Sequence, residues 1–312
     1  MLKLSLPFVA VALLAAAAQA EIAQPVIQRD AKGLVTITAA PGAVIYYTVD
    51  GTEPNQKGNG GVYLAPIQLP FKAVVKARAY DSSPVGAVTL DAQEGVATPP
   101  STIIPITQNR NWSSYDWVQR HNTLCALVRE RKPALVFIGD SITHQLEGKD
   151  VWRKYYEPRN AVDLGFGWDR TENVLWRLQH GELEGVEPKV AVIMIGTNNS
   201  GSNQPADIAI GIRAICTEIH QRTPNTKILL LGIFPRGEKP DDGRKRIDSI
   251  NSLIAAFDGQ DGITFLDIGT KFLNPDGTIS KEIMGDFLHP TPKGQEIWAE
   301  AMEPTLKKLL GE

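Results

Sequence analysis

Runs of consecutive apolar residues alternate with amphipathic segments along the C-terminal two-thirds of the chain. Apolar runs of this kind are typical of strands that are buried on both faces of a sheet. The segments between them place apolar residues at helical spacing. This alternation predicts an α/β domain with a five-stranded parallel sheet between two layers of helices. The expected strands are 134–138, 161–164, 190–195, 227–233 and 263–268, and the expected helices are 115–131, 171–180, 206–222, 244–257 and 292–310.

Residues 21–92 have a different pattern, with short runs of β-branched and aromatic residues and no helical period. One run leads into Asp50-Gly51, which is a strong turn signal. Short strands at close spacing predict a small β-sandwich domain. Residues 93–111 contain several prolines and are predicted to be a linker, followed by the α/β domain over 112–312. The expected strands of the sandwich are 34–38, 43–49, 62–64, 73–80 and 86–90.

Residues 1–20 have the features of a secretory signal peptide. Lys3 precedes an apolar stretch from Leu4 to Ala18, and Ala18-Gln19-Ala20 fits a small-x-small cleavage site. A membrane anchor is the alternative, but the apolar run is short for a span. We therefore expect export to the periplasm or the medium after cleavage near Ala20, and no membrane span in the remainder.

Composition narrows the choice of function only slightly. The 312 residues carry a net charge of −3 without a long basic run, so nucleic-acid binding is not expected. Cys125 and Cys216 both lie in helical apolar patterns. We expect two separate buried thiols, with a disulfide as the alternative that export would permit.

Candidate chemistry lies where the predicted strands end, because ligands of open α/β sheets bind beyond the carboxyl ends of the strands. Three strands are followed by polar and glycine-rich blocks, and a fourth block precedes the last helix. These blocks are Gly139–Thr143, Gly165–Thr171, Gly196–Asn199 and Asp286–Pro290.

Two of these blocks contain the groups of a serine hydrolase. His289 follows Asp286 by three residues, so the carboxylate can hold one ring nitrogen and leave the other free to act as a general base for a serine. Ser141 directly follows a strand, where the alternative role is to cap the next helix. Gly139-Asp-Ser-Ile-Thr143 lacks the Gly-x-Ser-x-Gly elbow, which argues against an α/β-hydrolase. Asn198 and loop N–H groups offer donors for an oxyanion.

The other histidines have more ordinary interpretations. His180 and His220 lie at the C-terminal ends of predicted helices, where a cation suits the helix dipole. His121 lies on an apolar helix face and is expected in the core. His144 follows the Ser141 block, and whether it reaches the site is left open.

The four blocks, in this order, resemble the SGNH (GDSL-type) hydrolase family over about residues 112–308. Within this family the sequence is most similar to the catalytic subunits of platelet-activating-factor acetylhydrolase. The stretches that carry this closer similarity are Asn173–Leu178, Gly181–Leu183, Gly196–Asn199, Pro235–Pro240 and Asp286–His289. The resemblance implies a flavodoxin-like, three-layer α/β/α domain that hydrolyses esters without a metal or another cofactor.

The resemblance also implies roles for individual residues. Ser141 would be the nucleophile, His289 the general base and acid, and Asp286 the group that orients His289. Asn198 and the backbone N–H groups of Ser141 and of the second block would form the oxyanion hole.

The second block departs from the family pattern at one position. The residue directly before Asp169 is usually the oxyanion glycine, and here it is Trp168, with Gly165 and Gly167 as further contributors nearby. A tryptophan keeps the backbone donor, and its indole could narrow the acyl pocket and favour a small acyl group. The alternative is an indole that packs against the sheet edge.

The N-terminal part has its own resemblance. Ile45–Pro54, with Val75–Ala79 downstream, resembles the small β-sandwich of the chitobiase or hexosaminidase C-terminal type. This implies association with glycan-active enzymes. The favoured function is an exported serine esterase for small acyl groups, with acetyl groups on glycans as the expected esters. Its expected partner is therefore a small acylated substrate.

Three alternatives remain open. The esters could instead belong to lipids or aryl compounds, or the chain could be a glycan-binding protein without activity. A metal-dependent phosphoesterase would use Asp140, Asp169, Asp286 and His289.

Overall fold

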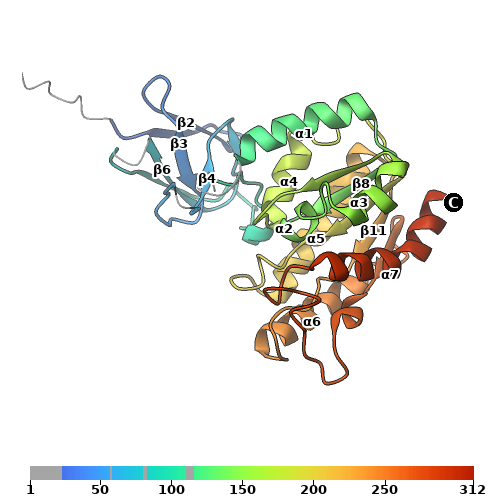
Figure 1. Ribbon diagram of the computed structural model, residues 1–312. Coiled ribbons are helices and arrows are strands. Elements are labelled where there is room, and N and C mark those ends of the chain that lie inside the picture. Colours follow the sequence, from blue (N-terminus) through green and yellow to red (C-terminus); the bar gives the residue numbers. More distant parts are fainter. Residues whose placement is uncertain (1–22, 57, 80–82, 110–115) are drawn as a thin grey trace, which may run out of the picture.

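The computed structural model describes residues 23–56, 58–79, 83–109 and 116–312. A small β domain and a larger α/β domain lie side by side, joined by an extended connecting segment (Figure 1). The predicted signal peptide at 1–20 lies outside the described residues. No helix in the described ranges has the length and apolar character needed to cross a membrane.

The α/β domain contains the predicted parallel sheet of five strands, and its strand order is β12-β11-β10-β8-β9. The chain passes from β8 to β9 on one side and then returns to β10 on the other side of β8. The order therefore reverses between β8 and β10, and this reversal is where open α/β sheets place their ligands. The strands are β8 (Leu135–Gly139), β9 (Ala161–Gly165), β10 (Val190–Met194), β11 (Lys227–Leu231) and β12 (Ile263–Leu266).

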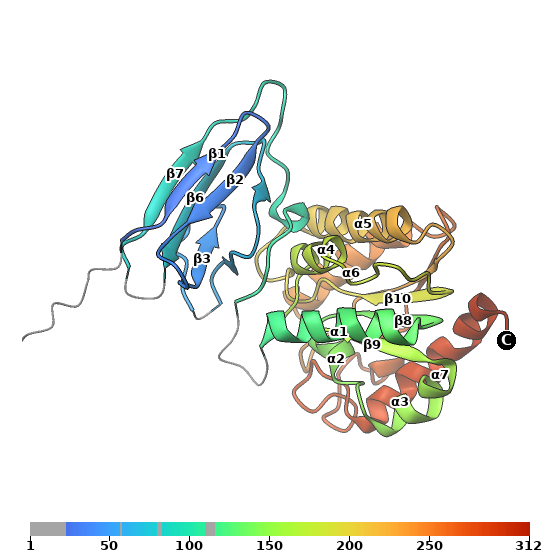
Figure 2. The ribbon, with the colours of Figure 1, turned by 90° about the horizontal axis from the view of Figure 1, so that it is seen from above.

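Successive side chains of each strand point to opposite faces of the sheet, so both faces are apolar. Val136 and Ile138 of β8 contact one helical layer, whereas Leu135 and Phe137 contact the other. Figure 2 shows the two layers on either side of the sheet, which confirms the predicted α/β/α architecture. One layer contains α1 (Trp117–Arg131), α4 (Thr171–Gln179), α5 (Pro205–Arg222) and α6 (Asp242–Ala255), and the other contains α2 (Ser141–His144), α3 (Asp150–Tyr155) and α7 (Pro292–Leu310).

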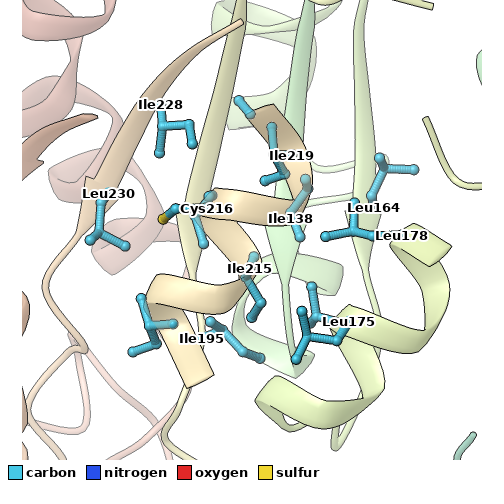
Figure 3. Close-up of a cluster of buried hydrophobic side chains, with 14 of the residues drawn as sticks. Ile138, Leu164, Leu175, Leu178, Ile195, Ile215, Cys216, Ile219, Ile228 and Leu230 are labelled. Carbon is cyan, nitrogen blue, oxygen red and sulfur yellow. The ribbon is translucent and has the colours of Figure 1, made fainter. Parts of the chain in front are cut away.

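The core under α4 and α5 is mostly aliphatic and also contains Trp176 of α4 and the sulfur of Cys216. Ile215 and Ile219 of α5 lie over Ile138 and its neighbours in the sheet (Figure 3). Cys216 is fully buried in this cluster, and Cys125 is buried on α1. Neither cysteine forms a disulfide, as the helical patterns predicted.

The sequence pattern did not predict the short helices α2 and α3. They span four and six residues, which is too short for a helical period to be visible. The last helix begins as predicted, because Thr291 Oγ1 accepts a hydrogen bond from Gly294 N and Pro292 occupies the first turn.

The β domain is a sandwich of two antiparallel sheets, with the orders β1-β2-β5 and β4-β3-β6-β7. Its core packs Val35 and Ile37 of one sheet against Val75 and Ala77 of the other. The sequence pattern did not reveal β1 and β5, which have four and two residues. The strands are β1 (Val26–Arg29), β2 (Leu34–Thr38), β3 (Ile45–Thr48), β4 (Gly61–Val62), β5 (Ile67–Gln68), β6 (Ala73–Ala79) and β7 (Gly86–Leu90).

The connecting segment is bonded to both domains. Thr107 Oγ1 accepts a hydrogen bond from Val62 N and donates one to Val62 O, both at 2.7 Å. On the other side, Asn173 Nδ2 of α4 donates to Ile106 O at 3.0 Å. The described part of the predicted linker is therefore attached to both domains rather than being a loose tether.

Candidate active site

Ser141 lies at the sharp turn from β8 into α2. The helix cap is not Ser141 but Asp140, whose Oδ1 accepts a hydrogen bond of 2.9 Å from Ile142 N. Gly139 allows the turn, because a Cβ atom at this position would lie 2.1 Å from Thr143 Oγ1. The alternative in which Ser141 serves as a helix cap is therefore wrong, and its hydroxyl is available for other contacts.

Ser141, His289 and Asp286 form one continuous chain of hydrogen bonds. Ser141 Oγ lies 2.9 Å from His289 Nε2, and His289 Nδ1 lies 2.7 Å from Asp286 Oδ2. The other carboxylate oxygen of Asp286 accepts the backbone N–H groups of Leu288 and His289, at 3.1 and 2.8 Å. Both ends of the imidazole are thereby held in the orientation that the sequence spacing predicted.

The contacts of Asp286 keep its carboxyl group ionised. Partial burial tends to raise its pKa, but the hydrogen bonds from the backbone and the ring of His289 outweigh this effect. The pKa of Asp286 consequently lies below its ordinary value. A carboxylate at this position favours the tautomer of His289 that carries its proton on Nδ1 and presents Nε2 to Ser141.

Trp168 occupies a left-handed backbone conformation in the turn after β9, with a φ of 68°. This conformation costs an L-residue with a side chain roughly 1–2 kcal/mol. Glycine has no Cβ atom and would adopt it without this cost. The indole is 49% exposed. It therefore does not pack into the sheet edge, which was the alternative considered from the sequence.

Asn198, in the loop after β10, is bonded to the same turn. Its Nδ2 donates a hydrogen bond of 2.9 Å to the backbone carbonyl of Asp169. An amide group carries two hydrogens, so this bond uses one of its two donors. The adjacent Asn199 is buried and accepts a hydrogen bond from Thr171 N at 3.1 Å, which joins the loop after β10 to the start of α4.

A buried ionic network beneath Trp168 was not predicted from the sequence. Arg177 Nε donates to Asp169 Oδ2 at 2.8 Å, and the same guanidinium group pairs with Glu182. Trp117 Nε1 and Gln108 Nε2 donate to the other oxygen of Asp169, at 2.7 and 2.8 Å. Burial raises the pKa of Asp169 to about 6, and Arg177 opposes this rise. The network holds the turn in place from within the domain.

The stretches Asn173–Leu178 and Gly181–Leu183, which carry the family resemblance, contain Arg177 and Glu182. These two stretches were the part of the sequence that could have pointed to the ionic network. Sequence spacing alone could not show that Arg177 pairs with both Asp169 and Glu182, because these contacts depend on the packing of α4.

A cavity of about 550 Å³ opens over Ser141. Its walls bring together residues from all four predicted blocks. His144 belongs to this wall, and burial lowers its pKa to about 4, so it is neutral near pH 7. The residues that line the cavity include Ser141, His144, Gly167, Trp168, Asn198, Leu288 and His289.

The other histidines lie outside this cavity. His121 is buried in the core, as expected, with Nε2 3.0 Å from the carbonyl oxygen of His180. His180 is the C-cap of α4, and His220 lies in the last turn of α5.

Gly165 has a packing role, because a Cβ atom there would lie 2.2 Å from His144 N.

The four residues of the metal-dependent alternative do not form one ligand set. Asp169 faces Arg177, whereas Asp140 is buried and caps α2, where burial raises its pKa to about 7. Within the described ranges, no group of three or more His, Cys, Asp or Glu side chains is arranged to hold a metal ion.

A five-stranded α/β/α fold with this serine site defines a GDSL-type acylhydrolase. The model of the GDSL-like lipase/acylhydrolase family matches residues 137–297, and the chain belongs to this family. It is a carboxylic ester hydrolase. A second family model, the chitobiase/β-hexosaminidase C-terminal domain, matches residues 30–89 and confirms the resemblance of the β domain.

Individual relatives agree with this assignment. Platelet-activating factor acetylhydrolase IB subunit alpha1 of Homo sapiens is 34% identical over 72% of this chain and 94% of the relative. Subunit alpha2 of Rattus norvegicus is 37% identical over 63% of this chain and 86% of its own length. A GDSL-like lipase from Bacteroides thetaiotaomicron has the same fold, with a TM-score of 0.53, 19% identity and coverage of 61% of this chain and 97% of that one.

Proposed function

We propose that this protein is an exported serine esterase that removes small acyl groups, chiefly acetyl, through a covalent acyl-enzyme. The observation that carries the proposal is the hydrogen-bonded chain from Ser141 through His289 to Asp286, at 2.9 and 2.7 Å. This arrangement activates a serine hydroxyl without any cofactor.

The reaction proceeds in two halves. Ser141 Oγ attacks the ester carbonyl carbon while His289 Nε2 takes the hydroxyl proton, and the C=O electron pair moves onto oxygen. When the tetrahedral intermediate collapses, the alcohol leaves with the proton from His289. Water then repeats the sequence on the acyl-enzyme, releasing the carboxylic acid and restoring Ser141. Asp286 stabilises the imidazolium ion that forms in each half.

The oxyanion hole is assigned to the backbone N–H groups of Ser141 and Trp168 and to the side-chain amide of Asn198. All three residues line the cavity over the serine. Gly167 lies in the same wall, and Gly165 lets the turn approach α2. Donors that are held in place before the reaction need no reorganisation as charge develops on oxygen.

Acetylated carbohydrates are the proposed substrates. The acetyl part is supported by relatives that are named acetylhydrolases. The carbohydrate part is supported by the N-terminal domain, whose family model takes its name from chitobiase and β-hexosaminidase. Export to the periplasm or the medium is supported by the leader-like pattern of residues 1–20.

A lipid acetyl ester is the second candidate, because the relatives are named for platelet-activating factor. The test compares release of acetate from O-acetylated oligosaccharides, 4-nitrophenyl acetate and an acetylated phospholipid, with and without a chelator. The oligosaccharide is expected to be preferred, and a fluorophosphonate probe should label Ser141. Absence of labelling would contradict the serine mechanism, and activity that disappears with the chelator would support metal chemistry instead.

A further inference from the structure

A second cavity, of about 210 Å³, lies where the β domain, the connecting segment and the α/β domain meet. Trp168 belongs to the wall of this cavity and also to the wall of the cavity over Ser141. The half-exposed indole therefore separates the catalytic cavity from the interdomain cavity. Figures 1 and 2 both show the connecting segment passing between the two domains.

Hydrogen bonds between the segments hold this interdomain cavity open. Asn109 Nδ2 donates to Asn55 O and Asn59 O, at 2.7 and 2.9 Å, which fixes the β-domain loop that contains these two residues. On the opposite wall, Ile106 N donates to Glu172 O at 3.3 Å. The walls come from segments far apart in the chain but are bonded directly to one another. A ligand would therefore meet a cavity that is already formed.

The lining is polar but nearly balanced in charge. The β domain contributes Asp50, whose Oδ1 accepts two hydrogen bonds from Thr52, at 3.0 and 2.6 Å. The α/β domain contributes Arg170 and Glu172, whose charged groups approach to 3.9 Å. Most of this charge is already paired, so the cavity suits a neutral ligand with many hydroxyl groups better than an ion.

Gln108 supplies an independent sign that a polar ligand belongs here. Its side chain lines the cavity and is only 6% exposed. Nε2 donates to Gly167 O at 3.1 Å and to Asp169 Oδ1 at 2.8 Å, two acceptors that fix the orientation of the amide. Among the residues that the structure describes, Gln108 Oε1 accepts no hydrogen bond. Leaving a buried acceptor without a partner is unfavourable, and a hydroxyl donor that reached this oxygen would satisfy it.

We propose that the interdomain cavity is a sugar subsite, which holds the sugar unit next to the one that carries the ester. The unit lies against the indole of Trp168 with its C–H face and directs its hydroxyl groups to Gln108 and the polar rim. A volume of about 210 Å³ is below the range of roughly 300–1,000 Å³ that drug-sized ligands occupy, so it takes a single ring. This proposal rests on the proposed esterase function and adds that oligosaccharides, rather than single sugars, are the preferred esters.

The experiment blocks the subsite without touching the catalytic groups. Thr52 is exposed on the β-domain side of the cavity, so Thr52→Trp fills the cavity with little cost to folding. Thr38→Trp is the matched control, because Thr38 is an exposed threonine of the same domain outside the cavity. Each full-length protein is assayed on O-acetylated cellotetraose, O-acetylated chitotetraose, O-acetylated glucose and 4-nitrophenyl acetate.

The wild type should cleave at least one tetrasaccharide with a kcat/KM at least tenfold above that for acetylated glucose. Thr52→Trp should remove this advantage, mainly through KM, while 4-nitrophenyl acetate hydrolysis stays within twofold, and Thr38→Trp should change neither. Equal rates on tetrasaccharide and glucose esters, or an unchanged tetrasaccharide advantage in Thr52→Trp, would overturn the subsite. Failure of the esterase proposal looks different, because 4-nitrophenyl acetate hydrolysis and Ser141 labelling would then be absent in the wild type.

Discussion

Asn198 Nδ2 donates a hydrogen bond of 2.9 Å to the backbone carbonyl of Asp169. This bond joins the loop after β10 to the turn after β9, and these two loops carry two of the three proposed oxyanion donors, Asn198 and Trp168. Both loops extend from the same end of a rigid parallel sheet, from the two strands that flank β8, so one hydrogen bond can fix their relative position.

Asn198→Ala should lower kcat by about 100- to 1,000-fold with little change in KM, because an oxyanion donor acts in the transition state. The lost bond to Asp169 should cost only about 0.5–1.5 kcal/mol of folding free energy. Steady-state kinetics and urea unfolding measure the two effects. Asn199→Ala is the control. The buried side-chain amide of Asn199 is hydrogen-bonded to Thr171 and Glu172 at the start of α4, so its removal should affect stability more than turnover. Full activity of the folded Asn198→Ala fraction would show that the amide only ties the loops.

Ser141→Ala should abolish ester hydrolysis and leave the unfolding midpoint nearly unchanged. The stability is retained because Asp140, not Ser141, caps α2. Removal of the nucleophile typically costs several orders of magnitude in rate. Hydrolysis of 4-nitrophenyl acetate and thermal unfolding check both statements. Turnover close to that of the wild type would exclude Ser141 as the nucleophile.

Asp163 should make folding stability depend on pH. Burial raises its pKa to about 8, although Gly165 N donates a hydrogen bond of 2.7 Å to it. The neutral form is thus favoured in the folded state, and its contribution is fully present below the unfolded pKa of about 3.9. This contribution is lost as the pH rises from there through about 8.

Asp163→Asn keeps an acceptor for Gly165 N and removes the titration. The variant should therefore lose less stability than the wild type between about pH 4 and pH 8, with each pKa unit worth about 1.4 kcal/mol. Urea unfolding at several pH values provides the comparison. Parallel pH profiles for the two proteins would show that Asp163 does not titrate as described.

Arg177→Ala should destabilise the fold by about 3–5 kcal/mol, because it leaves Asp169 and Glu182 as buried, unpaired carboxylates. Any folded fraction should also turn over more slowly, since Asp169 holds the turn that carries Trp168. The control is Arg222→Ala, which removes an accessible pair with Glu218 and should cost less than about 1 kcal/mol. Equal losses for the two variants in urea unfolding would contradict a structural role for the buried network.

Trp168→Gly should relax the preference for acetyl over longer acyl chains and should not destabilise the protein. The indole lines the cavity over Ser141, and a methylene group in a close-fitting pocket is worth about 1–3 kcal/mol of discrimination. Glycine also relieves the left-handed conformation at a φ of 68°. Values of kcat/KM on aryl esters of increasing chain length test the prediction. Identical profiles for both proteins would restrict Trp168 to its backbone N–H.

The sequence by itself determined the parts of this protein that depend on local pattern. Continuous apolar runs such as 190–195 are long enough to identify buried strands, and the polar blocks at their ends mark the site of an open α/β sheet. Asp286 and His289 are only three residues apart, so their contact follows from local spacing. The helices α2 and α3 were missed because one or two turns carry no readable period.

Only the tertiary structure decided the relationships between distant segments. Ser141 and His289 are 148 residues apart, and their hydrogen bond exists because β8 and the loop before α7 meet at one edge of the sheet. The left-handed backbone of Trp168 and its position between two cavities likewise depend on a long-range contact, the buried ion pair of the adjacent Asp169 with Arg177. Residue types and their order determine which elements form. Long-range packing determines which side chains meet, because contacts between segments far apart in the chain leave no local trace in the sequence.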